Sequence, residues 1–94
     1  MSRGFATLAE FRAALAAART GVDRLRAELP DDRAIHNVQL QLTALDDWTE
    51  AGGAPSQDQK DRLNFGQIAS REIDDIDSDL ARQLYALASH VIYW

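Results

Sequence analysis

The sequence predicts an all-α fold, a compact antiparallel bundle of four helices over residues 7–29, 32–50, 57–73 and 78–92. Three observations support this fold class. Apolar residues recur at spacings of three and four along each segment, which places them on one face of a helix. The segments are separated by short stretches whose proline, glycine or acidic residues end or cap helices. No stretch alternates apolar and polar residues with the period of a β-strand.

The first segment, residues 7–29, carries the longest apolar stripe. Thr7 and Glu10 have the spacing of a capping box, in which each side chain accepts a hydrogen bond from the backbone amide of the other residue. Pro30 ends the helix because proline cannot donate an amide hydrogen bond and disfavours helix in the residue before it. The stripe consists of Leu8, Phe11, Leu15, Ala18, Val22, Leu25 and Leu29.

A stripe of this kind can serve in two ways. It forms one wall of an intramolecular bundle, or it forms the seam of a dimeric coiled coil. The bundle is favoured because further amphipathic segments follow in the same chain. The alternative is a non-enzymatic interaction or regulatory module, a homodimer that self-associates through Leu8, Leu15, Val22 and Leu29.

The second segment, residues 32–50, begins after Asp31 and Asp32, whose carboxylates suit the positive end of a helix dipole. Only a few residues connect it to the first segment, which implies an antiparallel helical hairpin. Its apolar positions are Ile35, Val38, Leu42, Leu45 and Trp48.

Trp48 stands beside Asp46 and Asp47 near the end of the second segment. An indole next to two carboxylates is a candidate contact residue for a partner protein. The favoured interpretation is a core tryptophan whose N–H finds a nearby acceptor. Asp46, Asp47 and Trp48 are therefore candidates of second rank for a partner-binding site.

The third segment is introduced by a loop that contains two glycines and Pro55. Ser56 and Gln59 repeat the capping-box spacing, so a third helix is expected over residues 57–73. Gly66 inside this helix is unfavourable for helix stability, and it therefore indicates close packing against a neighbouring helix.

The fourth helix, residues 78–92, follows a bend over residues 74–77, where short acidic side chains favour a turn. Asp77 or Ser78 is expected to cap it. The apolar end of the chain is expected to be docked, with Trp94 covering the end of the bundle or a partner. The apolar stripe of this helix is Leu80, Leu84, Leu87 and Val91.

The stretch from Leu63 to Leu80 concentrates negative charge, and Arg71 is its only cation. Ile73 and Ile76 alternate with the acids and are expected to hold the stretch against the core. The acids would then form a rigid rim on the surface. The residues of this rim are Glu72, Asp74, Asp75, Asp77 and Asp79.

The net charge of −5 is unevenly distributed. Residues 1–45 carry six arginines and five acids, whereas residues 46–80 carry ten acids and three cations. A field of this sign repels nucleic acid and anionic membranes, and it attracts a basic protein surface. The alternative is that the acids only cap the fourth helix and remain solvated.

The sequence shows no arrangement typical of a metal site. Asp75, Asp77 and Asp79 match positions 1, 3 and 5 of a calcium-binding loop. However, Leu80 and Ala86 stand where that loop requires a glycine and a bidentate glutamate.

The two histidines, His36 and His90, fall on different predicted helices without a ligand partner at helical spacing. Each is expected at a surface or a helix cap. We therefore expect no metal, no cofactor and no enzymatic activity.

The 94 residues suffice for one domain, residues 1–94, with a single core and little room for a deep catalytic pocket. The absence of cysteine excludes disulfides and thiolate chemistry. No apolar run approaches the roughly 18 residues of a membrane span, and the N-terminus lacks the apolar core of a signal peptide. We expect a cytoplasmic protein that binds neither membranes nor nucleic acid.

The run from Leu63 to Leu84 resembles the C-terminal half of a small helical family of immunity proteins. Members of that family neutralise NAD(P)⁺ glycohydrolase effectors that the bacterial type VI secretion system delivers. The matching pieces are L-x-x-G-x-I-A at residues 63–69, R-E-I-D at residues 71–74 and D-x-D-L-A at residues 77–81. Gln41-Leu42 extends the similarity loosely.

The resemblance implies a cytoplasmic immunity protein that binds a cognate toxin domain and blocks its active-site cleft. The charge pattern agrees, because enzymes that bind a dinucleotide often present positive groups to its pyrophosphate. An acidic rim complements such a cleft without catalysing a reaction. The expected contact residues are Glu72, Asp74, Asp75, Asp77 and Asp79, with Asp46, Asp47 and Trp48 second.

Overall fold

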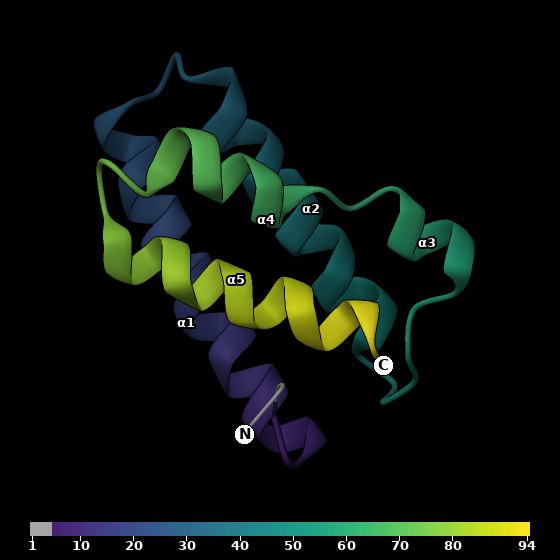
Figure 1. The fold of residues 1–94 in the computed structure, drawn as a ribbon. Coiled ribbons are helices and arrows are strands. Elements are labelled where there is room, and N and C mark those ends of the chain that lie inside the picture. The colour runs from purple at the N-terminus through teal and green to yellow at the C-terminus, as the bar shows by residue number, and fades with distance from the viewer. Residues whose placement is uncertain (1–4) are drawn as a thin grey trace.

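The computed structural model describes residues 5–94, so the first four residues of the expected domain lie outside the described part (Figure 1). Within that part the chain forms helices and no strands, and the all-α prediction is confirmed. A short π-helical segment over residues 69–73 continues directly from the helical turn over residues 65–68. The elements are α1 (Leu8–Glu28), α2 (Arg33–Thr49), α3 (Gln57–Asp61), α4 (Phe65–Ile68), η1 (Ala69–Ile73) and α5 (Ser78–Ile92).

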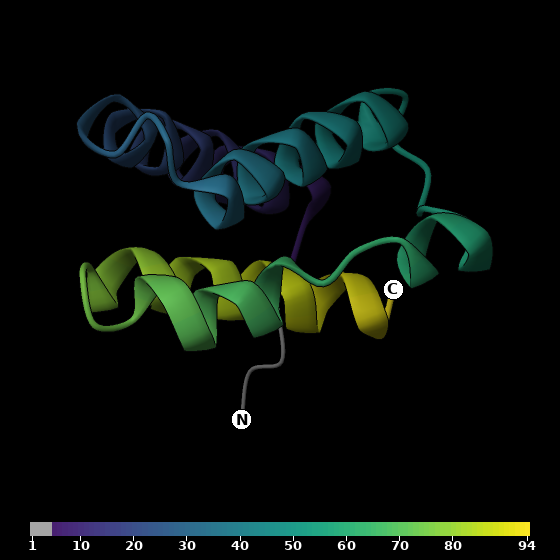
Figure 2. The same cartoon turned by 90° about the horizontal axis from the view of Figure 1, so that it is seen from above.

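The helices form two layers, which Figure 2 shows from above. One layer holds α1 and α2, and the other holds α4, η1 and α5. Between the layers, α1 packs on α5, and α2 packs on α4 and η1. α3 lies at one side, where the chain crosses from the first layer to the second. The turn from η1 to α5, which contains Asp74, Asp75 and Asp77 and is flanked by Glu72 and Asp79, therefore lies at one end of the second layer.

One hydrophobic core fills the space between the layers, and α3 alone among the described helices contributes no buried residue to it. Leu15 and Val22 of the first stripe lie inside this core, so they are not free to form the seam of a dimer. The bundle interpretation of the stripe is the one that the structure supports. The buried apolar residues are Phe11, Leu15, Ala18, Val22, Leu25, Ile35, Val38, Leu42, Leu45, Phe65, Ile68, Ala69, Ile73, Leu80, Ala81, Leu84, Leu87 and Val91.

Four helices begin at the capping residues that the sequence predicts. The Thr7 hydroxyl accepts a hydrogen bond from the Glu10 amide, while the Glu10 carboxylate accepts one from Ala6, one residue before the expected partner. Ser56 and Gln59 form both hydrogen bonds of a capping box. The other side-chain N-caps are Asp32 for α2 and Asp77 for α5.

The prediction of one continuous third helix over residues 57–73 is wrong. The chain leaves the helix after Asp61 and enters it again at Phe65. Gln41 of α2 stabilises the break: its side-chain oxygen accepts a hydrogen bond from the Asn64 amide at 2.8 Å, and its nitrogen donates to the Asn64 side-chain oxygen at 2.6 Å. Because this partner comes from another helix, local periodicity could not reveal the break.

Two glycines allow α5 to pack closely against its neighbours. A Cβ atom added to Gly66 would lie 2.9 Å from the Cβ of Ala88, so the predicted close packing at this glycine is confirmed. A Cβ atom added to Gly21 would lie 2.8 Å from Cδ1 of Leu80, which explains a glycine in the middle of α1. Close packing at both positions fixes α5 against α1 and α4.

Candidate partner-binding site

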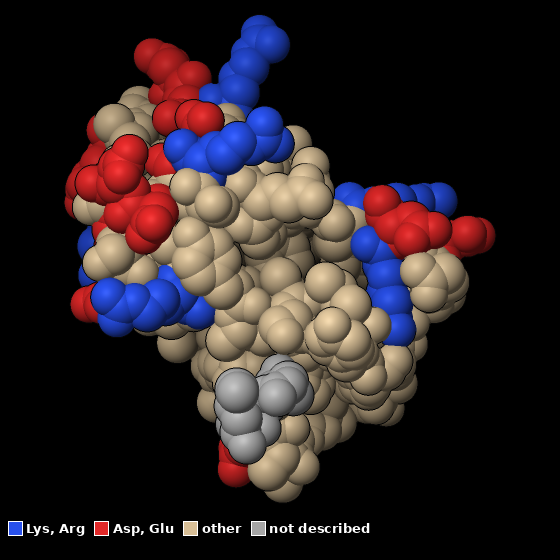
Figure 3. All heavy atoms as spheres, viewed as in Figure 1, with Lys and Arg blue, Asp and Glu red and all other residues tan. Residues whose placement is uncertain are grey.

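The five acids of the predicted rim lie where η1 turns into α5, and we call this part of the surface the acidic corner. The amide of Asp74 donates to the carbonyl of Ala69, and the amides of Ile76 and Asp77 both donate to the carbonyl of Ile73. Figure 3 shows acidic atoms gathered at the corresponding end of the α4–α5 face. The structure brings together the five acids of the predicted rim, all exposed: Glu72, Asp74, Asp75, Asp77 and Asp79.

The two isoleucines of the acidic corner have different environments. Ile73 is fully buried in the core, as predicted. The prediction that Ile76 also packs on the core is wrong, because its side chain is 51 % exposed. Ile76 lies in the tight turn closed by the carbonyl of Ile73, so the chain reverses before this side chain can reach the core. The corner therefore presents an apolar side chain among its carboxylates.

Two of the five acids have local partners. The Asp77 carboxylate accepts a hydrogen bond from the Leu80 amide at 3.0 Å and caps α5. Asp79 lies 3.6 Å from the guanidinium of Arg82, in a pair that solvent surrounds. Within residues 5–94, the carboxylates of the corner left without an ion pair or a hydrogen bond are those of Glu72, Asp74 and Asp75.

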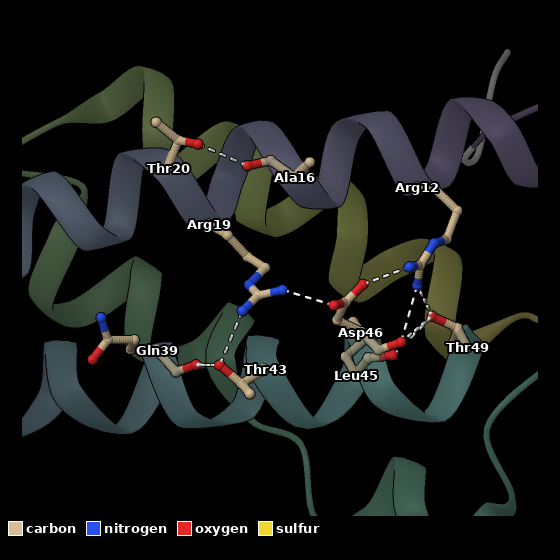
Figure 4. Close-up of polar contacts among 9 residues, drawn as sticks. All are labelled: Arg12, Ala16, Arg19, Thr20, Gln39, Thr43, Leu45, Asp46 and Thr49. Carbon is tan, nitrogen blue, oxygen red and sulfur yellow. Dashed lines mark hydrogen bonds and ion pairs between the residues drawn. The ribbon is translucent and has the colours of Figure 1, made fainter.

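Asp46, a predicted contact residue of second rank, takes part in the contact between α1 and α2. Its two carboxylate oxygens each lie 2.7 Å from a guanidinium nitrogen, one of Arg12 and one of Arg19. Arg12 also donates to the Thr49 hydroxyl at 2.9 Å and to the Asp46 carbonyl at 3.0 Å (Figure 4). Asp46 therefore stabilises the layer in which it lies.

Asp47 and Trp48 lie near the C-terminal end of α2. Asp47 is exposed. Trp48 is half-buried and does not belong to the core, so its interpretation as a core tryptophan is wrong. The structure does not bring these residues, or Asp46, together with the acidic corner, which lies at the other side of the molecule and in the other layer.

An aromatic cluster at one end of the bundle was not predicted. The His90 ring stacks on Phe11 with a centroid distance of 5.0 Å, and its Nδ1 accepts a hydrogen bond from the Phe5 amide at 3.2 Å. Trp94 packs edge-on against Phe11 at 4.9 Å, which is the docked position expected for this residue. Burial lowers the pKa of His90 below its ordinary value. The spacing of four between His90 and Trp94 was the only local signal.

A groove of about 390 Å³ runs along α4 and the C-terminal half of α5. Gly66 and Ala88, which pack closely against each other, both line it. Ile92 and Tyr93 lie at its edge and are 65 % and 78 % exposed, so the expectation of a docked end is wrong for these two residues. Figure 3 shows a hollow on this face among mostly uncharged atoms, and Lys60 is the charged residue among those that line it.

The part of the chain that the structure describes contains neither a metal cluster nor a membrane span. No three His, Cys, Asp or Glu residues within positions 5–94 come close enough to share a metal ion. None of the described helices combines the length and the apolarity that crossing a bilayer requires.

Comparison with known proteins identifies a family. No curated protein sequence and no solved structure matches the chain. A sequence model of the Tsi6 family matches residues 6–93, a range that includes the acidic corner and the groove. The resemblance to a type VI secretion immunity family is thereby confirmed. The chain belongs to the Tsi6 family of type VI secretion immunity proteins.

Proposed function

We propose that this immunity protein neutralises an NAD(P)⁺ glycohydrolase toxin by binding over the active-site cleft with its acidic corner. Membership of the family indicates that the partner is a cognate toxin effector. The enzymatic activity of that toxin rests on the resemblance of residues 63–84 and on charge. Positive groups that bind a pyrophosphate would also bind exposed carboxylates.

The observation that carries this proposal is the state of the carboxylates at the acidic corner. Glu72, Asp74 and Asp75 are exposed and have no cation partner within residues 5–94, so their charge is available to another protein. Ile73, buried beneath them, holds the bend in place before binding. A preorganised charged surface loses little conformational entropy on association, and complementary charge accelerates encounter.

The mechanism requires occupation of the cleft and no turnover by the immunity protein. The acids replace the anionic substrate electrostatically, and the bulk of the helical layers excludes it sterically. We place the interaction in the cytoplasm, where NAD(P)⁺ is available to the toxin. Asp47 and Trp48 remain contact residues of second rank, whereas both carboxylate oxygens of Asp46 are already bound to arginines.

A charge-reversal pair tests the proposal. The double variant Asp74→Lys/Asp75→Lys is expected to bind the toxin domain encoded by the neighbouring gene about tenfold more weakly or worse. The reason is that charges at the edge of an interface set the rate of association. The control Asp58→Lys/Asp61→Lys changes the net charge equally at two acids of α3. Binding is measured by calorimetry at two salt concentrations, and inhibition by NAD⁺ cleavage.

The controls separate the acidic corner from a general charge effect. Circular dichroism confirms that each variant is folded. Equal affinity of the Asp74/Asp75 variant and the wild type would reject the acidic corner as the contact surface. Equal losses in the two double variants would show that only the net charge matters. A toxin domain that does not cleave NAD(P)⁺ would reject the proposed target.

A further inference from the structure

The groove between α4 and α5 lies on the same face as the acidic corner. Figure 3 shows the hollow and the acidic atoms together in one view, with uncharged atoms between them. η1 continues from α4 to the corner, and α5 begins at the corner and ends at the groove. A protein that covers the corner over the area of an ordinary interface therefore reaches the groove as well.

The side chains around the groove favour an apolar occupant. Leu63 and Tyr85 line it and are half-buried, and Ile92 and Tyr93 at its edge are largely exposed. Its volume of about 390 Å³ is near the lower end of ligand pockets, roughly 300–1,000 Å³. A space of this size suits a large side chain that projects from a partner. Aromatic and aliphatic residues that enter such pockets contribute much of the free energy of binding at protein interfaces.

Charge distinguishes a toxin from other occupants. A second copy of this chain carries the same net charge of −5, which opposes self-association through a face that includes the acidic corner. A basic partner is attracted to the corner and is thereby oriented over the adjacent groove.

We infer that the α4–α5 groove receives an apolar side chain of the cognate toxin domain, from a toxin surface that is basic where it faces the acidic corner. This inference rests on the proposed function, since it assigns a second contact to the same complex. The corner supplies attraction and orientation, and the groove supplies most of the affinity. The exposed Ile76 extends the apolar contact into the corner itself.

A pair of matched variants tests the groove. Ile92→Ser/Tyr93→Ser removes the apolar edge, and the exposure of both residues leaves the fold unaffected. The control is Leu40→Ser, because Leu40 is 59 % exposed on α2 in the opposite layer. We expect the double variant to bind the toxin domain of the neighbouring gene roughly 30-fold or more weakly, with Leu40→Ser within about twofold of wild type. A third variant, Ser89→Trp, fills the groove and is expected to weaken binding similarly.

The outcomes distinguish the two proposals. If the wild type binds and Ile92→Ser/Tyr93→Ser binds equally well, the groove is not a contact and the proposed function stands. If Leu40→Ser loses as much affinity as the double variant, the assignment of this face is wrong. If the wild type does not bind the toxin domain, the proposed function and this inference both fail. If the half-life of the complex falls more in the groove variants than in the Asp74/Asp75 variant, the groove supplies most of the affinity and the corner mainly the attraction before binding.

Discussion

The contact at Asp46 and the acidic corner use the same kind of side chain for opposite purposes. Asp46 binds two arginines that lie seven residues apart on α1, and its charge is neutralised within the fold. At the corner, Arg82 is the only cation paired with any of the five acids among residues 5–94, and that pair is exposed. The charge of Asp46 is therefore neutralised because α1 places two arginines beside it, and no neighbouring helix does the same at the corner within residues 5–94.

A comparison within the acidic corner provides the largest expected effect. Ile73→Ala is expected to lower the free energy of unfolding by roughly 2–5 kcal/mol, because it leaves a cavity in the core. Ile76→Ala is expected to change it by less than about 0.5 kcal/mol, because that side chain is already half in solvent. Urea denaturation measures both values. Similar losses in the two variants would show that Ile76 packs on the core.

Asp46→Ala tests the structural role of the contact between α1 and α2. We expect a loss of about 1–2 kcal/mol, since one carboxylate serves two arginines but is about 30 % exposed and therefore partly screened. Asp47→Ala removes the adjacent exposed carboxylate and is expected to leave stability within about 0.5 kcal/mol of wild type. Loss of toxin affinity in Asp46→Ala without loss of stability would move this residue into the partner-binding site.

Asp77 has a structural role and a predicted role in binding, because it caps α5 and contributes charge to the acidic corner. Asp77→Ala is expected to lower stability by about 1 kcal/mol through loss of the cap. Asp77→Asn keeps an oxygen that can accept from the Leu80 amide, so it should retain stability while weakening toxin binding. Thermal unfolding and calorimetric titration separate the two roles. If Asp77→Asn destabilised the protein as much as Asp77→Ala, the cap would depend on the charge.

His90 gives the smallest effect, a dependence of stability on pH. Burial lowers its pKa in the folded state, so the unfolded state binds the proton more tightly. The contribution of neutral His90 is therefore complete above the unfolded pKa of about 6.5 and is lost as the pH falls towards the folded value. Protonation of Nδ1 also removes the acceptor for the Phe5 amide. His90→Asn keeps an acceptor without titrating, and urea denaturation across pH 7 to 5 should show a flatter profile for this variant.

The bounds of α1, α2 and α5 could be predicted from the sequence, because periodicity and capping residues are local signals. Thr7, Asp32 and Asp77 cap the helices at the expected positions. The break at Asn64 could not be predicted, because the groups that stabilise it belong to Gln41 in the other layer.

The acidic residues of the candidate site could be predicted from the sequence, but its exposed apolar residues could not. The five acids lie within residues 72–79, so they remain close to one another whatever the packing. The environments of Ile76, Ile92 and Tyr93 depend on where the chain turns relative to the core, and apolar residues next to apolar stripes gave no sign of exposure. The ion pairs of Asp46 with two arginines likewise could not be predicted, because they form only when α1 lies beside α2.

The π-helical segment η1 makes the direction of the acidic turn depend on the number of residues in the chain. Its hydrogen bond from the Asp74 amide to the Ala69 carbonyl encloses one residue more than an α-helical turn. Removing one residue between these positions would restore the α-helical bond and rotate the acidic turn by about 100° relative to α4. The direction in which the carboxylates face thus depends on chain length as well as on composition. Loss of an uncharged residue such as Ser70 would therefore turn Asp74 and Asp75 to a new direction relative to α4 while leaving every charged residue in place.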